Sequence, residues 1–483
     1  MEETLVSVAA WHDNEMGYSV RLAETAARPA DSWEGSGLHA ARCVKSGRKE
    51  NVCMDQSDPD LRIQRLGECR VPSPMSGIEF AKEDERVLFH SDPKEIQDYL
   101  CKEKDPPSFE MAGPRKTVYF DPSKLRCAIV TCGGLCPGLN DVIRAIVLSL
   151  FYHYGVSTVF GLPYGYEGLS YKYGHVPIEL NPDRVKDIHQ QGGTILGSSR
   201  GPQDVAEMVD TLERMNIGIL FAIGGDGTLR GAQAIAEEVT RRQLKISVIG
   251  IPKTIDNDIS YVQQSFGFET AVTETRTAIY SANMEALGAR NGIGLVKLMG
   301  RESGFIAAYA TLANSDVNYC LVPEVRFDLQ FFLKILKQRL ERKRHAVIVV
   351  AEGAGQEQME KTSEKDASGN IRFGDVGLFL KAKIGAYLKE IGMDFSLKYI
   401  DPGYTIRSMP ANPHDSVFCL LLGHNAVHAG MAGRTNTVVG FWRDEFTHVP
   451  ISLAASKRKK IDPKGKLWNN VLASTGQPGE MVA

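Results

Sequence analysis

Residues 218–258 read GILFAIGGDGTLRGAQAIAEEVTRRQLKISVIGIPKTIDND, and this stretch decides the fold class. Two short apolar runs rich in β-branched residues, Gly218–Ile223 and Ile246–Ile251, flank a segment from Leu229 to Arg242 with apolar residues at helical spacing. A strand, a helix and a strand in this order predict a β-α-β unit with parallel strands. Further strands are predicted at Leu125–Thr131, Ile293–Met299 and Ala346–Ala351. We therefore expect an α/β protein.

Glycine-rich turns follow two of these strands, at the sheet edge where open α/β sheets bind ligands. The turn GGDGT, Gly224–Thr228, lets a triphosphate approach the backbone, and Asp226 supplies a hard carboxylate oxygen suited to Mg²⁺. Asp226 as a simple helix cap is the structural alternative. The turn containing Gly133, Gly134 and Gly138 can also present amide groups and a helix N-terminus to phosphate, although many such turns are purely structural.

The strand after GGDGT ends in PKTIDND, Pro252–Asp258, which brings two kinds of reactive side chain to the same edge. A carboxylate here can accept the proton of an attacking alcohol, and we expect Asp256 to be this base. An acidic loop that binds a second metal or caps a helix is the alternative.

Composition excludes several broad classes. The chain has 483 residues, enough for two or three packed units, and 56 Lys plus Arg against 59 Asp plus Glu, so its overall charge indicates neither a nucleic-acid nor an anionic-membrane partner. No apolar stretch reaches membrane-spanning length. The odd number of cysteines, nine, predicts reduced thiols in an intracellular protein, and Cys132 and Cys136 are expected to be small buried thiols because further ligands at zinc spacing are lacking. The acidic start Met1–Glu3 does not resemble a secretory or organelle signal, so the cytoplasm is the expected compartment.

Two segments outside the repeated β-α pattern are interpreted structurally. Residues up to about Pro114 are rich in Ser, Pro, Glu and Lys, which predicts an extension that packs loosely or stays partly disordered. The basic run SKRKK, Ser456–Lys460, is expected to be a solvated loop rather than a targeting or nucleic-acid signal.

Seven motifs in one order make the pattern specific: GGLCPGLNDVIR, GGTILGSSRGP, GGDGT, PKTIDND, KLMGRESGF, VAEGAGQ and KYIDPGYTIR. From about Gly113 to Pro478 the chain resembles the ATP-dependent 6-phosphofructokinases, particularly the plant and trypanosomatid type. NAD kinases and lipid kinases share GGDGT but carry neither TIDND nor MGR.

The resemblance implies a phosphofructokinase-like fold of two domains, with mainly parallel sheets flanked by helices and an active site in the cleft between them. It divides the chain into an extension (1–115), a nucleotide-binding domain (116–268), a fructose 6-phosphate-binding domain (269–408) and a segment that returns to the nucleotide domain (409–483). It also implies Mg²⁺ as cofactor, ATP and fructose 6-phosphate as small-molecule substrates, and a homotetramer.

The resemblance further implies the site residues. ATP contacts fall on Gly133, Arg200, Gly201, Gly225, Asp226, Gly227 and Thr228, with Asp226 as the Mg²⁺ ligand. Fructose 6-phosphate contacts fall on Thr254, Ile255, Asp256, Met299, Gly300, Arg301, Glu352, Lys398, Tyr404, Thr405, Ile406 and Arg407. Asp256 is the implied general base, and Thr254, Lys253 and Arg200 complete the catalytic set. Guanidinium groups suit bidentate phosphate binding, which agrees with these roles.

Three questions stay open at this point. Gly227 favours ATP as donor, because an aspartate there accompanies pyrophosphate use in related enzymes, whereas Lys253 occurs with both donors. A pyrophosphate-dependent enzyme is therefore the alternative for the donor. A catalytically silent regulatory homologue, which would bind nucleotide without turnover, is a second and separate alternative. The fragment WHDNEMGYS, Trp11–Ser19, resembles part of glyceraldehyde-3-phosphate dehydrogenase but is too short to build that enzyme's site.

Overall fold

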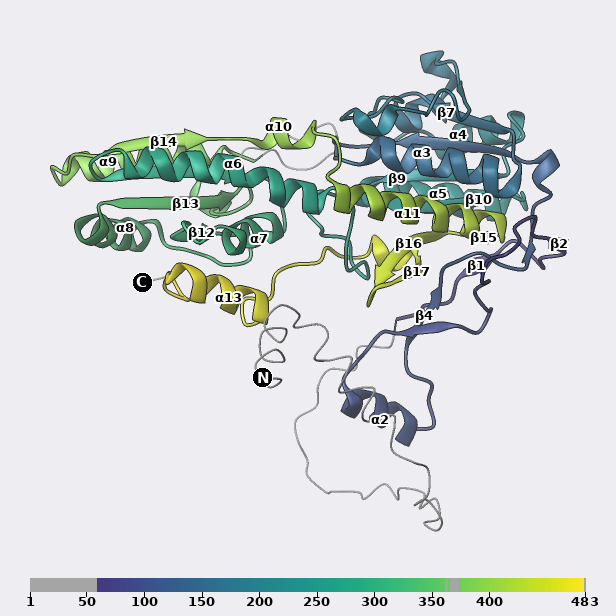
Figure 1. The fold of residues 1–483 in the computed structure, drawn as a ribbon, viewed down its shortest axis with the longest axis horizontal. Coiled ribbons are helices and arrows are strands. Elements are labelled where there is room, and N and C mark those ends of the chain that lie inside the picture. Colours follow the sequence, from purple (N-terminus) through teal and green to yellow (C-terminus); the bar gives the residue numbers. More distant parts are fainter. Residues whose placement is uncertain (1–58, 361–363, 365–372, 482–483) are drawn as a thin grey trace, which may run out of the picture. The chain divides into compact units, whose positions relative to one another are not determined.

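The computed structural model describes residues 59–360, 364 and 373–481, and two main sheets organise this part of the chain (Figure 1). The larger sheet has nine strands in the order β3-β4-β17-β16-β10-β9-β6-β7-β8. Their bounds are β3 Arg86–Leu88, β4 Ser108–Met111, β17 Glu445–Pro450, β16 Thr437–Trp442, β10 Ser247–Pro252, β9 Ile219–Gly224, β6 Arg126–Thr131, β7 Thr158–Leu162 and β8 Ile178–Leu180. The strands from β16 to β7 are parallel, and antiparallel strands extend both edges.

The β-α-β unit of residues 218–258 lies at the centre of this sheet. Strands β9 and β10 pair in parallel from Ile219 opposite Ser247 to Gly224 opposite Pro252. The helix between them, α5 (Asp226–Arg241), begins three residues before the expected position because GGDGT itself forms its first turn. The predicted strands are confirmed to within one residue at each end.

Helices cover both faces of the larger sheet, as the alternating side chains of its strands require. On β6, Cys127 and Ile129 join the hydrophobic cluster of α3 and α11, whereas Ala128 and Val130 join the cluster of α4 and α5. The helix bounds are α3 Leu139–Ser149, α4 Val205–Arg214 and α11 Pro413–Met431.

The smaller sheet is parallel throughout, in the order β12-β13-β11-β14. Its bounds are β11 Gly292–Leu298, β12 Tyr319–Leu321, β13 His345–Ala351 and β14 Ser396–Ile400. Val347 and Val349 of β13 pack with α6 and α7, and Ile348 and Val350 pack with α8 and α9 on the other face. The helices are α6 Phe268–Leu287, α7 Phe305–Ala313, α8 Leu329–Lys343, α9 Val376–Glu390 and the short α10 Gly403–Arg407. One hydrophobic cluster includes residues of both sheets, so the two sheets share a core.

The described part of the expected N-terminal extension differs from the prediction. Strands β3 and β4 extend the larger sheet, the Phe109 side chain is fully buried, and Glu110 is buried beside Arg434. Loose packing is therefore wrong for residues 109–115, whereas Val87 is the only buried residue among residues 59–107. The extension also contains β1 Gln64–Arg65, β2 Val71–Pro72 and α2 Pro93–Cys101, with β5 Thr117–Val118 following. The dehydrogenase-like fragment Trp11–Ser19 lies outside the described residues.

The segment 409–483 divides between the two sheets. Helix α11, strands β16 and β17 and helix α12 (Ile451–Ala454) pack in the larger sheet's layers, and the short β15 (Arg434–Thr435) lies between α11 and β16 in the chain. Helix α13 (Lys466–Thr475) instead packs on α7, and the Gln477 side chain hydrogen-bonds both backbone groups of Cys320. The end of the chain thus returns to the smaller sheet, contrary to the expectation. In the described ranges, no helix has both the length and the apolar character needed to span a membrane.

Candidate active site

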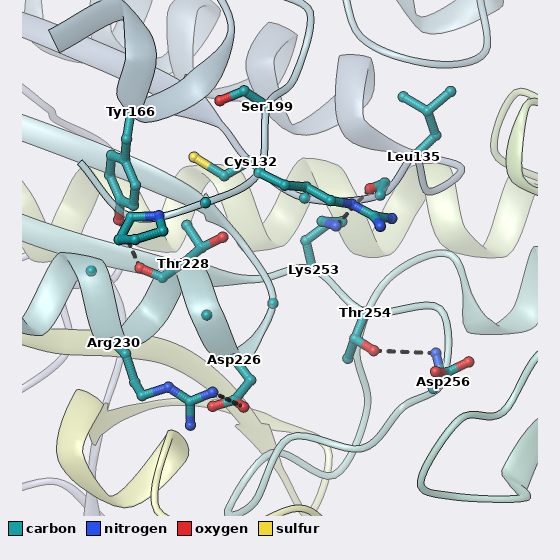
Figure 2. Close-up of a pocket in the computed structure, with 18 of the residues that line it drawn as sticks. Cys132, Leu135, Tyr166, Ser199, Asp226, Thr228, Arg230, Lys253, Thr254 and Asp256 are labelled. Atoms are coloured by element: carbon teal, nitrogen blue, oxygen red, sulfur yellow. Dashed lines mark hydrogen bonds and ion pairs between the residues drawn. The ribbon is translucent and has the colours of Figure 1, made fainter. Parts of the chain in front are cut away.

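A cavity of about 770 Å³ lies where β6, β9 and β10 end, and it receives side chains from both main sheets. Figure 2 shows Asp226, Lys253, Thr254 and Asp256 around it. The structure brings together in its lining most of the residues expected at the site: Gly133, Arg200, Gly201, Gly225, Asp226, Gly227, Thr228, Lys253, Thr254, Ile255, Asp256, Met299, Arg301, Glu352 and Arg407. Each of the seven motifs contributes at least one of these residues.

The GGDGT turn forms the N-terminus of α5, where backbone N–H groups face the cavity without helical partners. Gly224 has no room for a side chain, because a Cβ there would lie 2.1 Å from the Thr228 hydroxyl oxygen. The Thr228 carbonyl accepts a hydrogen bond of 2.7 Å from the Tyr166 hydroxyl, which fixes the first turn of the helix. By contrast, a Cβ on Gly227 would meet nothing within 4 Å. A side chain at Gly227 would therefore enter the open space of the cavity without meeting packed atoms.

The turn after β6 forms the opposite wall. Gly133 has a φ of 87°, and its backbone is held by Ser199 and by the Ser198 hydroxyl. Gly134 lies close to the Arg200 guanidinium, since a Cβ there would be 3.2 Å from Nη2. Burial raises the pKa of the Cys132 thiol to about 12, which confirms the interpretation as an inert buried thiol.

Lys253 connects the two walls. Its Nζ donates to the Gly134 carbonyl at 2.7 Å, and a Cβ on Gly133 would be 3.3 Å from the same nitrogen. Burial lowers the pKa of this lysine. The ammonium group is therefore held at the turn of Gly133 and Gly134, on the side of the cavity that also contains Arg200.

The loop Pro252–Asp258, called the catalytic loop below, is held in place by the hydroxyl groups of Thr254 and Ser265. Thr254 Oγ1 donates to Asp258 Oδ1 at 2.8 Å and accepts from the Asp256 backbone N–H at 3.2 Å. The Ser265 hydroxyl donates to the Thr254 carbonyl at 2.6 Å. Asp256 thus lies at a fixed position in the cavity wall.

The Asp256 carboxylate is incompletely paired. Its Oδ1 is buried and has no hydrogen-bond partner. Burial raises the pKa of Asp256 well above its ordinary value, and the neighbouring carboxylates of Asp258 and Glu352 raise it further, against the opposing effects of the Arg301 backbone and of Arg458. An unpaired buried oxygen costs free energy, so this position is one where a ligand hydroxyl would restore a lost hydrogen bond.

The side of the smaller sheet contributes two arginines and one glutamate to the cavity lining. Glu352 follows β13, and its backbone N–H donates to the Leu298 carbonyl at 2.9 Å. Burial raises the pKa of Glu352, although the positive charges of Arg407 and Arg301 oppose this rise. The Arg301 guanidinium lies 4.4 Å over the Phe373 ring. This wall can bind a sugar phosphate through its arginines and sugar hydroxyl groups through Glu352.

Five of the expected site residues do not line the cavity: Gly300, Lys398, Tyr404, Thr405 and Ile406. Lys398 Nζ lies 3.8 Å from Glu285 at the surface. The Tyr404 side chain is 82% exposed beneath Arg407, whereas Ile406 is only 1% exposed and belongs to the core. Their roles as fructose 6-phosphate contacts stay predictions.

Charged residues outside those expected at the site also contact its carboxylates. Arg230 pairs with Asp226 at 2.6 Å, and Arg458 reaches the same carboxylate from the run Ser456–Lys460. The Lys459 side chain is partly buried, and its Nζ donates to the Val262 and Gln263 carbonyls. The solvated-loop interpretation is therefore wrong for Arg458 and Lys459, because this loop pairs with the catalytic loop. The basic run SKRKK is the feature of the sequence that could have indicated these contacts with carboxylates.

Comparisons with known proteins indicate the family of the chain. Residues 126–430 match the phosphofructokinase family model. Relatives named ATP-dependent 6-phosphofructokinase include one from Borreliella burgdorferi, 49% identical over 87% of this chain and 98% of its own, and one from Trypanosoma cruzi, 45% identical over 85% and 87%. A chloroplastic relative from Arabidopsis thaliana is 49% identical over 76% of this chain and 68% of its own.

Solved structures support the same fold. A pyrophosphate-dependent phosphofructokinase from Marinobacter aquaeolei aligns with a TM-score of 0.60 at 19% identity, over 73% of this chain and 91% of its own. Phosphofructokinase from Pichia pastoris aligns with a TM-score of 0.56 at 21% identity, over 73% of this chain and 37% of its own. The fold is thus the α/β phosphofructokinase fold, and the chain belongs to the phosphofructokinase family.

Proposed function

We propose that this chain is an ATP-dependent 6-phosphofructokinase, which transfers the γ-phosphoryl group of ATP to the 1-hydroxyl of fructose 6-phosphate. The observation that carries the proposal is the unpaired, buried Oδ1 of Asp256, in a cavity that a phosphate-binding helix N-terminus shares with a wall of arginines. A kinase for an alcohol needs a proton acceptor at this position between donor and acceptor.

The donor occupies the side of the larger sheet. The amides of Gly225, Gly227 and Thr228 bind the polyphosphate at the start of α5, where the helix dipole favours anions. Gly133 and Gly201 allow the nucleotide to approach the backbone from the opposite wall. We accordingly assign nucleotide binding to residues 116–268.

Magnesium fits the donor set. In the described part of the chain, no group of three or more His, Cys, Asp or Glu side chains is arranged to hold a metal ion by itself. Mg²⁺ is commonly held by one or two carboxylates together with substrate phosphates, and Asp226 and Asp258 line the cavity as such carboxylates. When bound, the ion would neutralise charge on the β- and γ-phosphate oxygens.

The acceptor occupies the side of the smaller sheet. Arg407 and Arg301 bind the 6-phosphate, and Glu352 and Met299 contact the sugar. We assign this role to residues 269–408. The 1-hydroxyl then lies at the catalytic loop, within reach of Asp256.

The residues of the cavity then perform the transfer. Asp256, in its ionised form, accepts the proton of the 1-hydroxyl as the oxygen attacks the γ-phosphorus, and ADP leaves with the electrons of the broken bond. Arg200 and Lys253 stabilise the charge of the transferring group. Thr254 keeps the loop in position through its two hydrogen bonds.

Turnover with each donor tests the function. We expect ADP release that depends on fructose 6-phosphate and Mg²⁺, and a slower reaction when pyrophosphate replaces ATP. A faster reaction with pyrophosphate would reassign the donor. Nucleotide binding without sugar-dependent turnover would indicate a silent homologue.

Gly227→Asp tests the donor assignment at one residue. The substitution fits the empty protein, because a Cβ at Gly227 meets nothing within 4 Å. A carboxylate there would repel the α-phosphate region, so ATP-dependent turnover should fall at least about tenfold while sugar-phosphate binding persists. An undiminished ATP rate would show that Gly227 does not select the donor.

We also propose a homotetramer in the cytoplasm, with no nucleic-acid or membrane partner. The tetramer rests on the family resemblance and the closed symmetry common in soluble oligomers. Light scattering tests it, and a fully active monomer would contradict it.

A further inference from the structure

The loop of residues 456–460 is fixed against the catalytic loop, although it lies some 200 positions further along the chain. The Lys459 backbone N–H donates to the Asp258 carbonyl at 2.7 Å, and Arg458 forms an antiparallel bridge with Ile259. The Ser303 hydroxyl donates to the Lys459 carbonyl from the smaller sheet's side. The backbone of Arg458 therefore has a defined position at the cavity.

The side chain of Arg458 lies between the carboxylate of Asp226, which we assign to Mg²⁺, and the catalytic loop. Its Nη2 is 3.7 Å from Asp226 Oδ2, its Nη1 is 3.5 Å from Asp258 Oδ2, and its side chain is 28% exposed. Each carboxylate has a shorter partner: Arg230 lies 2.6 Å from Asp226, and Thr254 lies 2.8 Å from Asp258. Arg458 can therefore leave both carboxylates without leaving either unpaired.

The charge balance at this point changes when a donor binds. A triphosphate brings several anionic oxygens to the GGDGT turn, beside Asp226. A guanidinium has five donors and no acceptor, and its fork matches phosphate better than the two long, single contacts that Arg458 makes with carboxylates. Lys253, on the opposite side, already donates to a backbone carbonyl.

We propose that Arg458 is a phosphate-binding residue of this site, which donates to the β- and γ-phosphate oxygens of the donor. Its pairing with Asp226 and Asp258 is the position it takes before the donor binds. This inference rests on the proposed kinase function and extends its binding site to the C-terminal loop. The phosphoryl group is then held by cations on both sides: Lys253 with Arg200, and Arg458.

Equilibrium binding of ATP, ADP and AMP, measured by calorimetry without sugar and both with and without Mg²⁺, tests the inference. We expect Arg458→Gln to weaken ATP binding about tenfold or more and ADP binding less, because charge-assisted hydrogen bonds to phosphate are lost. AMP binding should change less than about twofold, since AMP lacks the groups that Arg458 contacts. Arg458→Lys should lie between wild type and Arg458→Gln, because it retains the charge but not the fork.

Lys457→Gln is the matched control. Lys457 is the exposed neighbour of Arg458, and its substitution removes the same charge from the loop. ATP affinity in this variant should stay within about twofold of the wild type. Unchanged ATP binding in Arg458→Gln, an equal loss in the Lys457 control, or an equal loss for AMP would each overturn the inference. If Arg458→Gln fails to fold, the same outcomes are read from Arg458→Lys.

The test separates this inference from the proposed function. Binding requires no turnover, so wild-type protein that lacks sugar-dependent ADP release would contradict the function and leave the Arg458 result readable. Normal wild-type turnover with unaltered nucleotide binding in Arg458→Gln would contradict only the role of Arg458.

Discussion

Glu110 and Asp256 are both carboxylates enclosed by the described part of the chain, yet their surroundings are opposite. Glu110 lies 2.9 Å from Arg434, 2.9 Å from Arg65 and 3.1 Å from His448. Asp256 has one buried oxygen without any partner and other carboxylates nearby. The first carboxylate joins the N-terminal segment to the larger sheet, and the second faces the cavity.

Their pKa values shift in opposite directions. Burial alone would raise the pKa of Glu110, but the hydrogen bond from His448 and the charges of His448 and Arg434 together lower it. The pKa of Asp256 is raised, because burial is reinforced by two carboxylates. Glu110, which stabilises the fold, thus has charged partners on both oxygens. Asp256, which we assign to the chemistry, has one oxygen without a hydrogen-bond partner.

Asp256→Asn should give the largest effect on activity. Turnover should fall by about 10²- to 10⁴-fold, since the amide cannot accept the proton, whereas binding of both substrates should persist. The free energy of unfolding should not fall, because the substitution removes a carboxylate whose ionised form is destabilised. Steady-state kinetics and thermal unfolding check this pair of outcomes, and nearly unchanged turnover would show that Asp256 is not the base.

Glu110→Gln should reverse this pattern. The side chain of Arg434 is 1% exposed and would keep only the half-exposed Glu83 as an ion-pair partner, so the substitution should lower the free energy of unfolding by about 1.5 to 3 kcal/mol. Turnover per folded molecule should stay near that of the wild type. Denaturant unfolding measures the loss, and a stability change below about 1 kcal/mol would contradict a structural role for this cluster.

The pH dependence should separate the two carboxylates within one protein. Because burial and two neighbouring carboxylates raise the pKa of Asp256 to about 8 and only its ionised form accepts a proton, kcat/KM should fall as pH decreases through about 8, beyond the range of ordinary aspartates. Because the pKa of Glu110 is lowered, its contribution to stability is complete above the ordinary glutamate value of 4.5 and is lost as pH falls through the folded-state value. A loss of kcat/KM over the same pH range as acid unfolding would contradict the assignment of these two effects to different carboxylates.

Arg407→Ala and Lys398→Ala should give smaller and graded effects. Arg407 lines the cavity, so its loss should raise KM for fructose 6-phosphate about tenfold and KM for ATP much less. Lys398 pairs with Glu285 outside the cavity lining, and its loss should raise the same KM less than about threefold. Equal effects of Arg407→Ala on both substrates would reject its assignment to the sugar phosphate.

The periodic segments of the sequence were the easiest to predict. The strands around GGDGT and PKTIDND follow from short apolar runs that end in Gly, Pro or Asp, and the structure confirms them. Residues directly after these strands, such as Asp226 and Asp256, must gather at one edge of a parallel sheet, so local patterns place them together.

Long-range pairing could not be predicted from local patterns. Arg458 reaches the site through a bridge to Ile259, and Glu110 pairs with Arg434 from the other end of the chain. Charged loops usually lie in solvent, and only the tertiary fold shows that these loops do not. The residues of KYIDPGYTIR divide in the same way: Arg407 reaches the cavity, whereas Ile406 points into the core.

Phosphorus NMR of the reaction mixture tests the central claim most directly. With fructose 6-phosphate, ATP and Mg²⁺, the wild-type protein should convert the γ-phosphate signal into a new phosphomonoester at the sugar's 1-position, in equal amount to the ADP formed, and the Asp256→Asn variant should do so far more slowly. Inorganic phosphate as the only product, or a new phosphate at another sugar position, would contradict the assignment of this site to phosphoryl transfer onto the 1-hydroxyl.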